Sequence, residues 1–324
     1  MNLSNQSTRS TRRGFMGATA GAVAASSAMT SHASTDSLSP QDKIFTRDVA
    51  IDVPQPGLRR AVVDPDDNVL VAAGKSLLIY SPQGTLTQRV DFDRPVRCLA
   101  AGDEHITVGI RDHVRVLDRS GRLKTWLPTI GRGHLIGDLI QNDGGVMVTD
   151  ITAGNLARFT DRGRWETIAS RKNGFDLPAG GRFSWQTPGR LLVTNPSRHR
   201  IEYRSERGQM VSTWGKRSRE VIGFQGCCNP LAAATLDDGS IVTAEAGQTR
   251  IKRFDANGNF LQQVAGPDDF FKLATETDTH VEQAHNSLMC AAGGIDLATN
   301  GGNTLWMLHS AEKQLIRWRI SERA

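Results

Sequence analysis

A unit of turn, strand, loop and strand recurs six times along this chain. Residues 239–258, GSIVTAEAGQTRIKRFDANG, show it most plainly, with an apolar strand, a short loop, a second strand and a closing Asp-x-x-Gly turn. The same order of features recurs at residues 68–84, 104–121, 145–163, 190–208 and 303–318. A repeat of roughly 40 residues is typical of proteins that stack one small supersecondary unit many times.

Each unit contains enough sequence for four strands. A further apolar stretch precedes the repeat, as in RRAVVDP at residues 59–65, and another follows it, as in FLQQVAG at residues 260–266. The strands are short, rich in Val, Ile, Leu and Thr, and bounded by turn residues, which indicates small antiparallel sheets. A single four-stranded sheet cannot bury both of its faces, whereas a ring of such sheets can. We therefore predict an all-β fold over residues 44–324, a six-bladed β-propeller of four-stranded antiparallel blades, with an insertion at residues 267–289 between blades five and six.

The sixth blade lacks its last strand, because the final copy of the repeat ends near Ile320. Residues 44–52, IFTRDVAID, alternate as a strand does and precede the first full unit. We predict that this N-terminal strand completes the sixth blade. Such closure protects two sheet edges that would otherwise invite aggregation.

The units resemble NHL repeats, a family of six-bladed propellers. The resemblance rests on units of the type IVTAEAGQTRIKRFDANGNF, residues 241–260, and extends over nearly all of the repeat region. It implies a propeller that serves as a binding module or a sensor, or, in a minority of the family, as an enzyme. It does not name an activity, because a fold does not fix a function.

The N-terminus resembles a twin-arginine export signal. Arg12 and Arg13 lie in STRRGFMG, which is followed by the uncharged stretch at residues 18–30 and by small residues at Ser31 and Ala33. The uncharged stretch is shorter than the roughly 20 residues that a membrane span requires. We therefore predict a signal peptide at residues 1–33, a flexible mature N-terminus at residues 34–43, no membrane span in the mature protein, and a periplasmic or secreted location. The twin-arginine route carries folded proteins, often with a cofactor, so the resemblance favours a bound metal or redox group.

The charge of the chain argues against nucleic acid as a partner. The formal net charge is +5, and residues 1–33 contain three arginines and no acid, so the mature chain carries +2. Binding to nucleic acid calls for a concentrated basic face. We expect instead a monomer with a protein partner or a small ligand at one mouth of the propeller channel.

Three of the four cysteines align at that mouth. Cys227 and Cys228 lie in GFQGCCNP, and Cys290 lies at the equivalent place in the next unit, just before the innermost strand of each blade. The same alignment brings His134 to the mouth, and His285 lies in the insertion that leads to Cys290. Thiolates and imidazoles in a closed cup suit zinc, copper or iron, so one interpretation is a metal site formed by these five residues.

Two other interpretations of the cysteines remain open. In an oxidising compartment Cys290 could form a disulfide with Cys227 or Cys228, or the two adjacent cysteines could pair with each other. Cys98 differs, because it lies inside the apolar strand VRCLAA, and we expect it to be a buried structural thiol.

The sequence supports two classes of function. The first is a binding, assembly or redox-linked sensor module that acts through the cysteine-bearing mouth, and the alternative is a metal-dependent lyase or hydrolase on a propeller scaffold. Few inward histidines and acids are available for catalysis. Glu245 and Asp150, which occupy equivalent positions in their units, could add carboxylates, although we expect them in solvated turns. The sequence leaves open whether the chain is an enzyme.

Overall fold

The structure is a computed structural model. It describes residues 43–142, 145–173, 175, 182–187, 189–226, 228–246, 249–270 and 294–322. The predicted signal peptide and nearly all of residues 34–43 lie outside these ranges, as does most of the predicted insertion.

The described residues form six four-stranded antiparallel sheets in a ring, which confirms the predicted six-bladed propeller. Blade one consists of β2 (Leu58–Val63), β3 (Val69–Ala73), β4 (Ser76–Tyr80) and β5 (Leu86–Asp91). Blade two consists of β6 (Cys98–Ala101), β7 (His105–Ile110), β8 (His113–Asp118) and β9 (Leu123–Trp126). Blade three consists of β10 (Ile136–Asn142), β11 (Gly145–Asp150), β12 (Asn155–Phe159) and β13 (Trp165–Ser170). Blade four consists of β14 (Phe183–Thr187), β15 (Arg190–Asn195), β16 (Arg200–Ser205) and β17 (Met210–Trp214). Blade five consists of β18 (Ala232–Thr235), β19 (Ile241–Glu245), β20 (Arg250–Phe254) and β21 (Phe260–Ala265). Blade six consists of β22 (Ile295–Ala298), β23 (Thr304–His309), β24 (Gln314–Glu322) and β1 (Lys43–Asp52).

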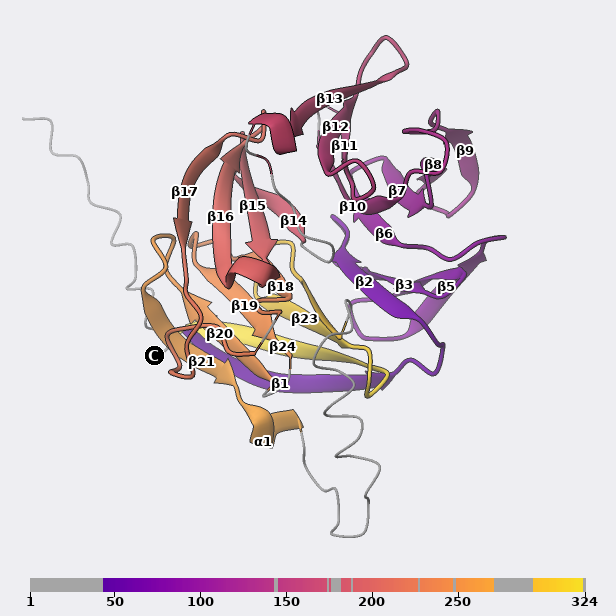
Figure 1. The fold of residues 1–324 in the computed structure, drawn as a ribbon. Coiled ribbons are helices and arrows are strands. Elements are labelled where there is room, and N and C mark those ends of the chain that lie inside the picture. Colours follow the sequence, from indigo (N-terminus) through magenta and orange to yellow (C-terminus); the bar gives the residue numbers. More distant parts are fainter. Residues whose placement is uncertain are drawn as a thin grey trace, which may run out of the picture. The chain divides into compact units, whose positions relative to one another are not determined.

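The N-terminal strand closes the ring, as predicted. β1 pairs antiparallel with β24 from Lys43 opposite Glu322 to Asp52 opposite Gln314, with one irregularity in register between Arg47 and Val49. Figure 1 shows the indigo β1 lying along the yellow β24, although the two strands come from opposite ends of the chain. The sixth blade is therefore held together by residues more than 260 positions apart.

The repeated x-x-x-Gly turn joins the third and fourth strands of a blade. In blade five, Asp255 accepts hydrogen bonds at Oδ1 from the backbone N–H groups of Asn257 and Asn259, both at 2.8 Å. Gly258 adopts a φ of +88°, which a residue with a side chain rarely tolerates. This local chemistry explains why the turn recurs at a fixed place in the repeat.

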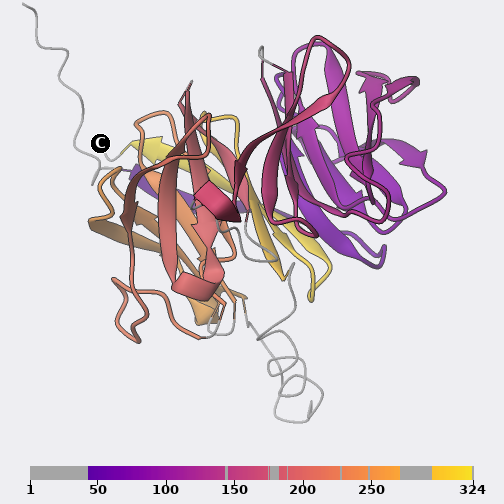
Figure 2. The ribbon, with the colours of Figure 1, turned by 45° about the horizontal axis from the view of Figure 1, so that its top comes forward.

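The core consists of six apolar clusters among the described residues, and each lies between two neighbouring blades. The second strand of a blade is buried on both faces, and β3 and β19 contain no exposed residue. The fourth strand faces solvent, and all four residues of β9 are exposed. Figure 2 shows the yellow strands of blade six beside the orange strands of blade five, the pair that shares one of these clusters. Because both faces of the second strand are covered, most of its residues are apolar, as in VLVAA of β3.

Helical structure is scarce in the described residues. It consists of the four-residue helix α1 (Pro267–Phe270), which begins the predicted insertion, and two short 3₁₀ turns. A helix with the length and apolar character of a membrane span does not occur in this part of the chain.

Candidate functional site

The first strand of every blade borders the central channel. β2, β6, β10, β14, β18 and β22 contact one another in turn around the ring. Their N-terminal ends meet at one mouth, where Arg97 Nε donates to the carbonyl of Ile136 at 2.8 Å and Arg182 Nη2 donates to the carbonyl of Arg59 at 2.6 Å. We name this end the arginine mouth, after Arg59, Arg97 and Arg182.

A cavity of about 460 Å³ occupies the opposite half of the channel. Its lining is formed by the C-terminal residues of the first strands, with Arg60 and Asp237 as the charged side chains among the described residues that line it. The inner edge of each blade pairs with no further strand, so its backbone polar groups face this space. The cavity has the volume of a small-molecule pocket, and its lining is mostly apolar with several polar side chains.

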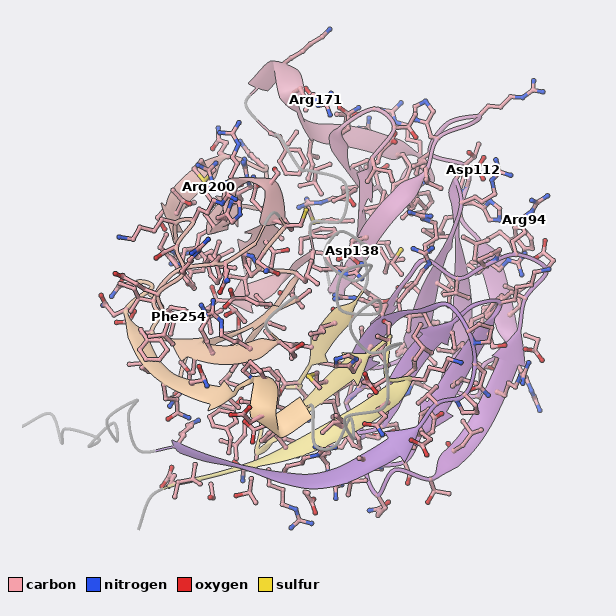
Figure 3. All side chains as sticks on the ribbon, turned by 60° about the horizontal axis from the view of Figure 1, so that its bottom comes forward. Arg94, Asp112, Asp138, Arg171, Arg200 and Phe254 are labelled. Atoms are coloured by element: carbon pink, nitrogen blue, oxygen red, sulfur yellow. The ribbon has the colours of Figure 1, made fainter. Side chains whose placement is uncertain are left out.

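Four charged side chains separate this cavity from the arginine mouth. Arg60 Nη1 is 3.0 Å from Asp296 Oδ1, and Arg60 Nε is 3.6 Å from Asp138 Oδ1. Arg182 Nε reaches the same oxygen of Asp296 at 3.7 Å. We name this group, which comes from blades one, three, four and six, the channel plug; Figure 3 labels Asp138 near the centre of the ring.

The aspartates of the channel plug also accept hydrogen bonds from two backbone N–H groups on the inner edges of the blades. Asp138 accepts a hydrogen bond at Oδ2 from the backbone N–H of Phe183 at 3.1 Å, and Asp296 accepts one at Oδ2 from that of Ala61 at 2.8 Å. Burial raises the pKa of Asp138 in spite of the nearby positive charge of Arg60. Burial also disfavours the charged form of Arg60, but the carboxylates of Asp138 and Asp296 outweigh it and raise its pKa. The plug therefore depends on its mutual ion pairs.

His134 lies at the arginine mouth, two residues before β10. Its Nδ1 is 2.6 Å from Oδ2 of Asp150 at the end of β11. The Asp150 side chain is 5% exposed and accepts hydrogen bonds at Oδ1 from the backbone N–H groups of Thr152 and Ala153, whereas His134 is 35% exposed. A histidine oriented in this way by a buried carboxylate can bind a metal or transfer a proton through its other ring nitrogen.

The loop before β18 is fixed by hydrogen bonds from side chains on two blades. We name residues 215–231 the blade-five loop. Asn229 donates at Nδ2 to the carbonyl of Ala246 at 3.0 Å and accepts at Oδ1 from the N–H of the same residue at 2.9 Å. His199 of blade four places Nε2 2.8 Å from the carbonyl oxygen of Gly226.

A buried ion pair supports the blade-five loop from below. Lys252 Nζ and Glu245 Oε1 are 2.6 Å apart, and neither side chain is exposed. Lys252 also donates to the carbonyls of Val221 at 2.9 Å and Gly223 at 2.6 Å. Glu245 accepts at Oε2 from the backbone N–H of Gln225 at 2.9 Å. The loop conformation therefore depends on charges inside blade five.

Two of the five predicted metal-site residues lie in described segments that lead into a first strand. Cys228 is half-buried in the blade-five loop, and His134 precedes the first strand of blade three. Cys227, Cys290 and His285 lie outside the described residues, so the convergence of the three cysteines stays a prediction. Within the ranges that the structure describes, no group of three or more His, Cys, Asp or Glu side chains is arranged to hold a metal ion.

The other predictions for single residues had mixed outcomes. Cys98 is fully buried in β6, as expected, and burial raises the pKa of its thiol. The expectation that Glu245 and Asp150 lie in solvated turns is wrong, because they are 0% and 4% exposed. Each ends the second strand of its blade and pairs with a basic side chain, Glu245 with Arg250 and Asp150 with His134.

The arginines of this mouth were not among the residues that the sequence marked as functional. Arg59, Arg97 and Arg182 each stand next to the start of a first strand. A basic residue at a strand end is usually solvated, so the residue type alone does not indicate a functional position. The available signal was positional, since each of these arginines lies within one residue of the start of a first strand.

Comparison with known proteins shows the fold alone. No family model matches the sequence, and no curated protein matches it in sequence. Among solved structures, a protein of unknown function from Bacteroides thetaiotaomicron VPI-5482 is similar with a TM-score of 0.63 at 12% identity, over 86% of this chain and 76% of that one. A streptogramin B lyase gives a TM-score of 0.56 at 12% identity, over 87% of this chain and 99% of that one. Virginiamycin B lyase from Staphylococcus aureus gives 0.51 at 13% identity, over 85% and 99%. The chain is thus a six-bladed propeller whose structural neighbours include streptogramin B lyases.

Proposed function

We propose that this chain is an exported, NHL-like propeller that binds a partner protein or a small ligand at its arginine mouth, in a binding, assembly or redox-linked sensing role. The observation that carries the proposal is the support of the blade-five loop by Lys252 and Glu245. Two fully buried charges are costly to desolvate, and a pair of apolar residues would stabilise blade five as well or better. A pair whose members both hydrogen-bond one loop is better explained by the need to fix that loop.

The cysteines give this mouth its chemistry in the proposal. Cys228 lies on the supported loop and His134 lies at the same mouth. Cys227, Cys290 and His285 would complete a site for zinc, copper or iron. The competing form is a disulfide among the same cysteines, which would make the mouth a stapled binding surface or a redox switch.

Metal and thiol analysis of the exported, folded chain tests the proposal. A transition metal that is retained on purification and lost in Cys228→Ser supports the metal form, with Cys98→Ala as the matched control that removes a core thiol and keeps the metal. No metal, together with one thiol pair that reacts with maleimide only after reduction, supports the stapled form. No metal, with all four thiols reactive after unfolding without a reductant, would contradict a cysteine-bearing site.

The proposed export is tested separately. Arg12 and Arg13 are replaced by lysine together in the full-length chain, which is produced in a bacterium with a twin-arginine route. The wild-type chain should collect in the periplasmic fraction, and the double variant should remain in the cytoplasm. Arg9→Lys is the matched control and should not change the distribution. A double variant that is still exported would show that the paired arginines are not the address.

A second candidate is a metal-dependent lyase or hydrolase, favoured by the pairing of His134 with Asp150. A buried carboxylate that orients a partly exposed histidine is a common arrangement for an acid, a base or a metal ligand. The names of the structural neighbours make a streptogramin B compound the first substrate to try. Loss of the parent compound, followed by mass spectrometry and abolished in His134→Gln, would support the enzyme; no turnover with or without added divalent metal would contradict it for this substrate class.

A further inference from the structure

The arginine mouth collects positive charge from three blades. Arg59 of blade one, Arg97 before the first strand of blade two and Arg182 before that of blade four are all half-buried. Arg97 donates from Nε to a carbonyl of blade three, and Arg182 donates from Nη2 to the carbonyl of Arg59. These hydrogen bonds hold two guanidinium groups in place; Arg182 also pairs with Asp296 of the channel plug, whereas Arg97 has a carbonyl as its partner.

The acids nearby do not balance this charge. The two aspartates of the channel plug are matched by the two arginines of the plug itself. Within the described ranges, no carboxylate forms an ion pair with Arg59 or with Arg97. The region therefore carries an excess of two positive charges, on residues that are partly withdrawn from water.

The excess of positive charge also affects the ionisation of Arg97. Burial lowers its pKa, and the positive charges of Arg59 and Arg182 lower it further. Two half-buried guanidinium groups without a counter-charge, next to a third that is paired with Asp296, are destabilising unless something compensates them. A bound anion supplies that compensation at a mouth that opens to solvent.

We propose that Arg59, Arg97 and Arg182 form a seat for an oxyanion, the carboxylate, phosphate or sulfate group of a ligand. Guanidinium groups bind such groups through paired, charge-assisted hydrogen bonds, and a rigid framework reduces the entropy lost on binding. This proposal deepens the proposed function, because it names the chemical class of ligand that the arginine mouth would bind. The residues of the seat come from blades one, two and four, and the cysteines of blade five are not part of it.

Anion binding to the full chain at low ionic strength tests the seat. Sulfate, inorganic phosphate and succinate are titrated one at a time in a buffer free of other oxyanions, with calorimetry and thermal unfolding as readouts. At least one of them should bind saturably and raise the unfolding temperature of the wild-type chain. The three probes separate phosphate, sulfate and carboxylate as the source of the charge.

The decisive variant is Arg97→Gln, with Arg94→Gln as the matched control. Arg94 lies three residues earlier, and its side chain is 54% exposed towards the outside of the ring. Removing one charged donor should weaken the preferred anion about tenfold or more, because such hydrogen bonds contribute strongly in a partly desolvated site. Arg97→Lys keeps the positive charge but loses the paired N–H donors of the guanidinium group, so its anion affinity should be intermediate. The anion affinity of Arg94→Gln should match that of the wild type.

A second measurement separates a ligand seat from a structural role. In anion-free buffer Arg97→Gln should unfold at the wild-type temperature or above it, because the substitution removes repulsion. The absence of saturable binding by all three anions, or an equal loss of affinity in Arg94→Gln and Arg97→Gln, would overturn the seat. Anion affinity is read without regard to metal content or thiol state, so its failure would leave the cysteine-bearing site standing, and the reverse also holds.

Discussion

Lys252 and Glu245 form an ion pair of 2.6 Å in which neither side chain is exposed, and each also hydrogen-bonds the backbone of the blade-five loop. Arg250 makes a second contact with Glu245, at 2.8 Å from Nη2 to Oε2. Burial lowers the pKa of Lys252, and the attraction of Glu245 opposes that effect. The pair therefore links the stability of blade five to the conformation of the loop that carries Cys228.

Removal of one partner of this pair should be strongly destabilising. We expect Lys252→Met to lower the free energy of unfolding by about 3 kcal/mol or more, because two loop carbonyls lose their donor and a buried carboxylate loses a counter-charge. Urea denaturation followed by tryptophan fluorescence measures the change. The control is Arg164→Met, which breaks an exposed pair with Glu166 and should cost less than about 1 kcal/mol. Equal losses in the two variants would contradict the role of the buried pair.

The stability of the protein should fall in mildly acidic solution because of His309. Burial lowers the pKa of this residue to about 4, against 6.5 for the free side chain. Between these two pH values the unfolded chain takes up a proton that the folded chain excludes, so folding loses up to about 3 kcal/mol as the pH falls.

The variant His309→Asn isolates this contribution. Asparagine can still accept the hydrogen bond that Nδ1 accepts from the backbone N–H of Glu312 at 3.2 Å. The difference in unfolding free energy between wild type and variant should be constant above pH 7.5 and should shift in favour of the variant from pH 6.5 to pH 4. A difference that does not change with pH would contradict the prediction.

The repeat made most of the fold predictable. The second strands are covered on both faces, so stretches such as residues 69–73 are apolar throughout, and the glycine at the end of each turn is required by its positive φ. Even the long-range closure by residues 44–52 could be inferred, because a ring leaves one strand missing and one alternating segment unassigned. These features are local in sequence or follow from counting strands.

The candidate site was predictable only in its location. The alignment of the units placed His134 and Cys228 at one mouth, but the partners of these residues depend on contacts between blades. The pair Arg60–Asp296 joins positions 236 residues apart, and no local pattern marks either residue as buried. Glu245 stands before a turn, where polar residues are usually solvated, and only the position of the blade-five loop covers it. Such contacts follow from the assembled ring and not from the repeat.

The effects of substitutions at Cys98 and Gly109 on the free energy of unfolding should be strongly coupled. The two residues are opposite each other in β6 and β7, and a Cβ at position 109 would overlap Cys98 Sγ and lie 3.1 Å from Leu139 Cδ2. We expect Gly109→Ala to cost about 1–3 kcal/mol by overpacking, and the addition of Cys98→Ala to recover part of that loss, with a coupling energy above about 0.5 kcal/mol in a double-mutant cycle. Gly302→Ala, where the nearest atom is Asn300 Oδ1 at 3.2 Å, is the control. Strictly additive effects would show that the two residues do not share space.

The stability of the closed ring should depend on β1, the strand that completes blade six. A chain that begins at Val53 lacks β1 and exposes the edge of β24, together with the cluster between blades five and six against which Phe45 packs. We expect its unfolding temperature to fall by about 10 °C or more and its tendency to self-associate to rise, because an unpaired strand edge recruits other chains. A chain that begins at Ser39 keeps the whole of β1 and should behave as the full-length protein does. A synthetic peptide of residues 43–52 should restore monomeric behaviour to the shorter chain when added in excess, since it supplies the missing pairing with β24. If the chain that begins at Val53 stays monomeric at wild-type stability, the other three strands of blade six suffice and closure by the N-terminal strand is dispensable.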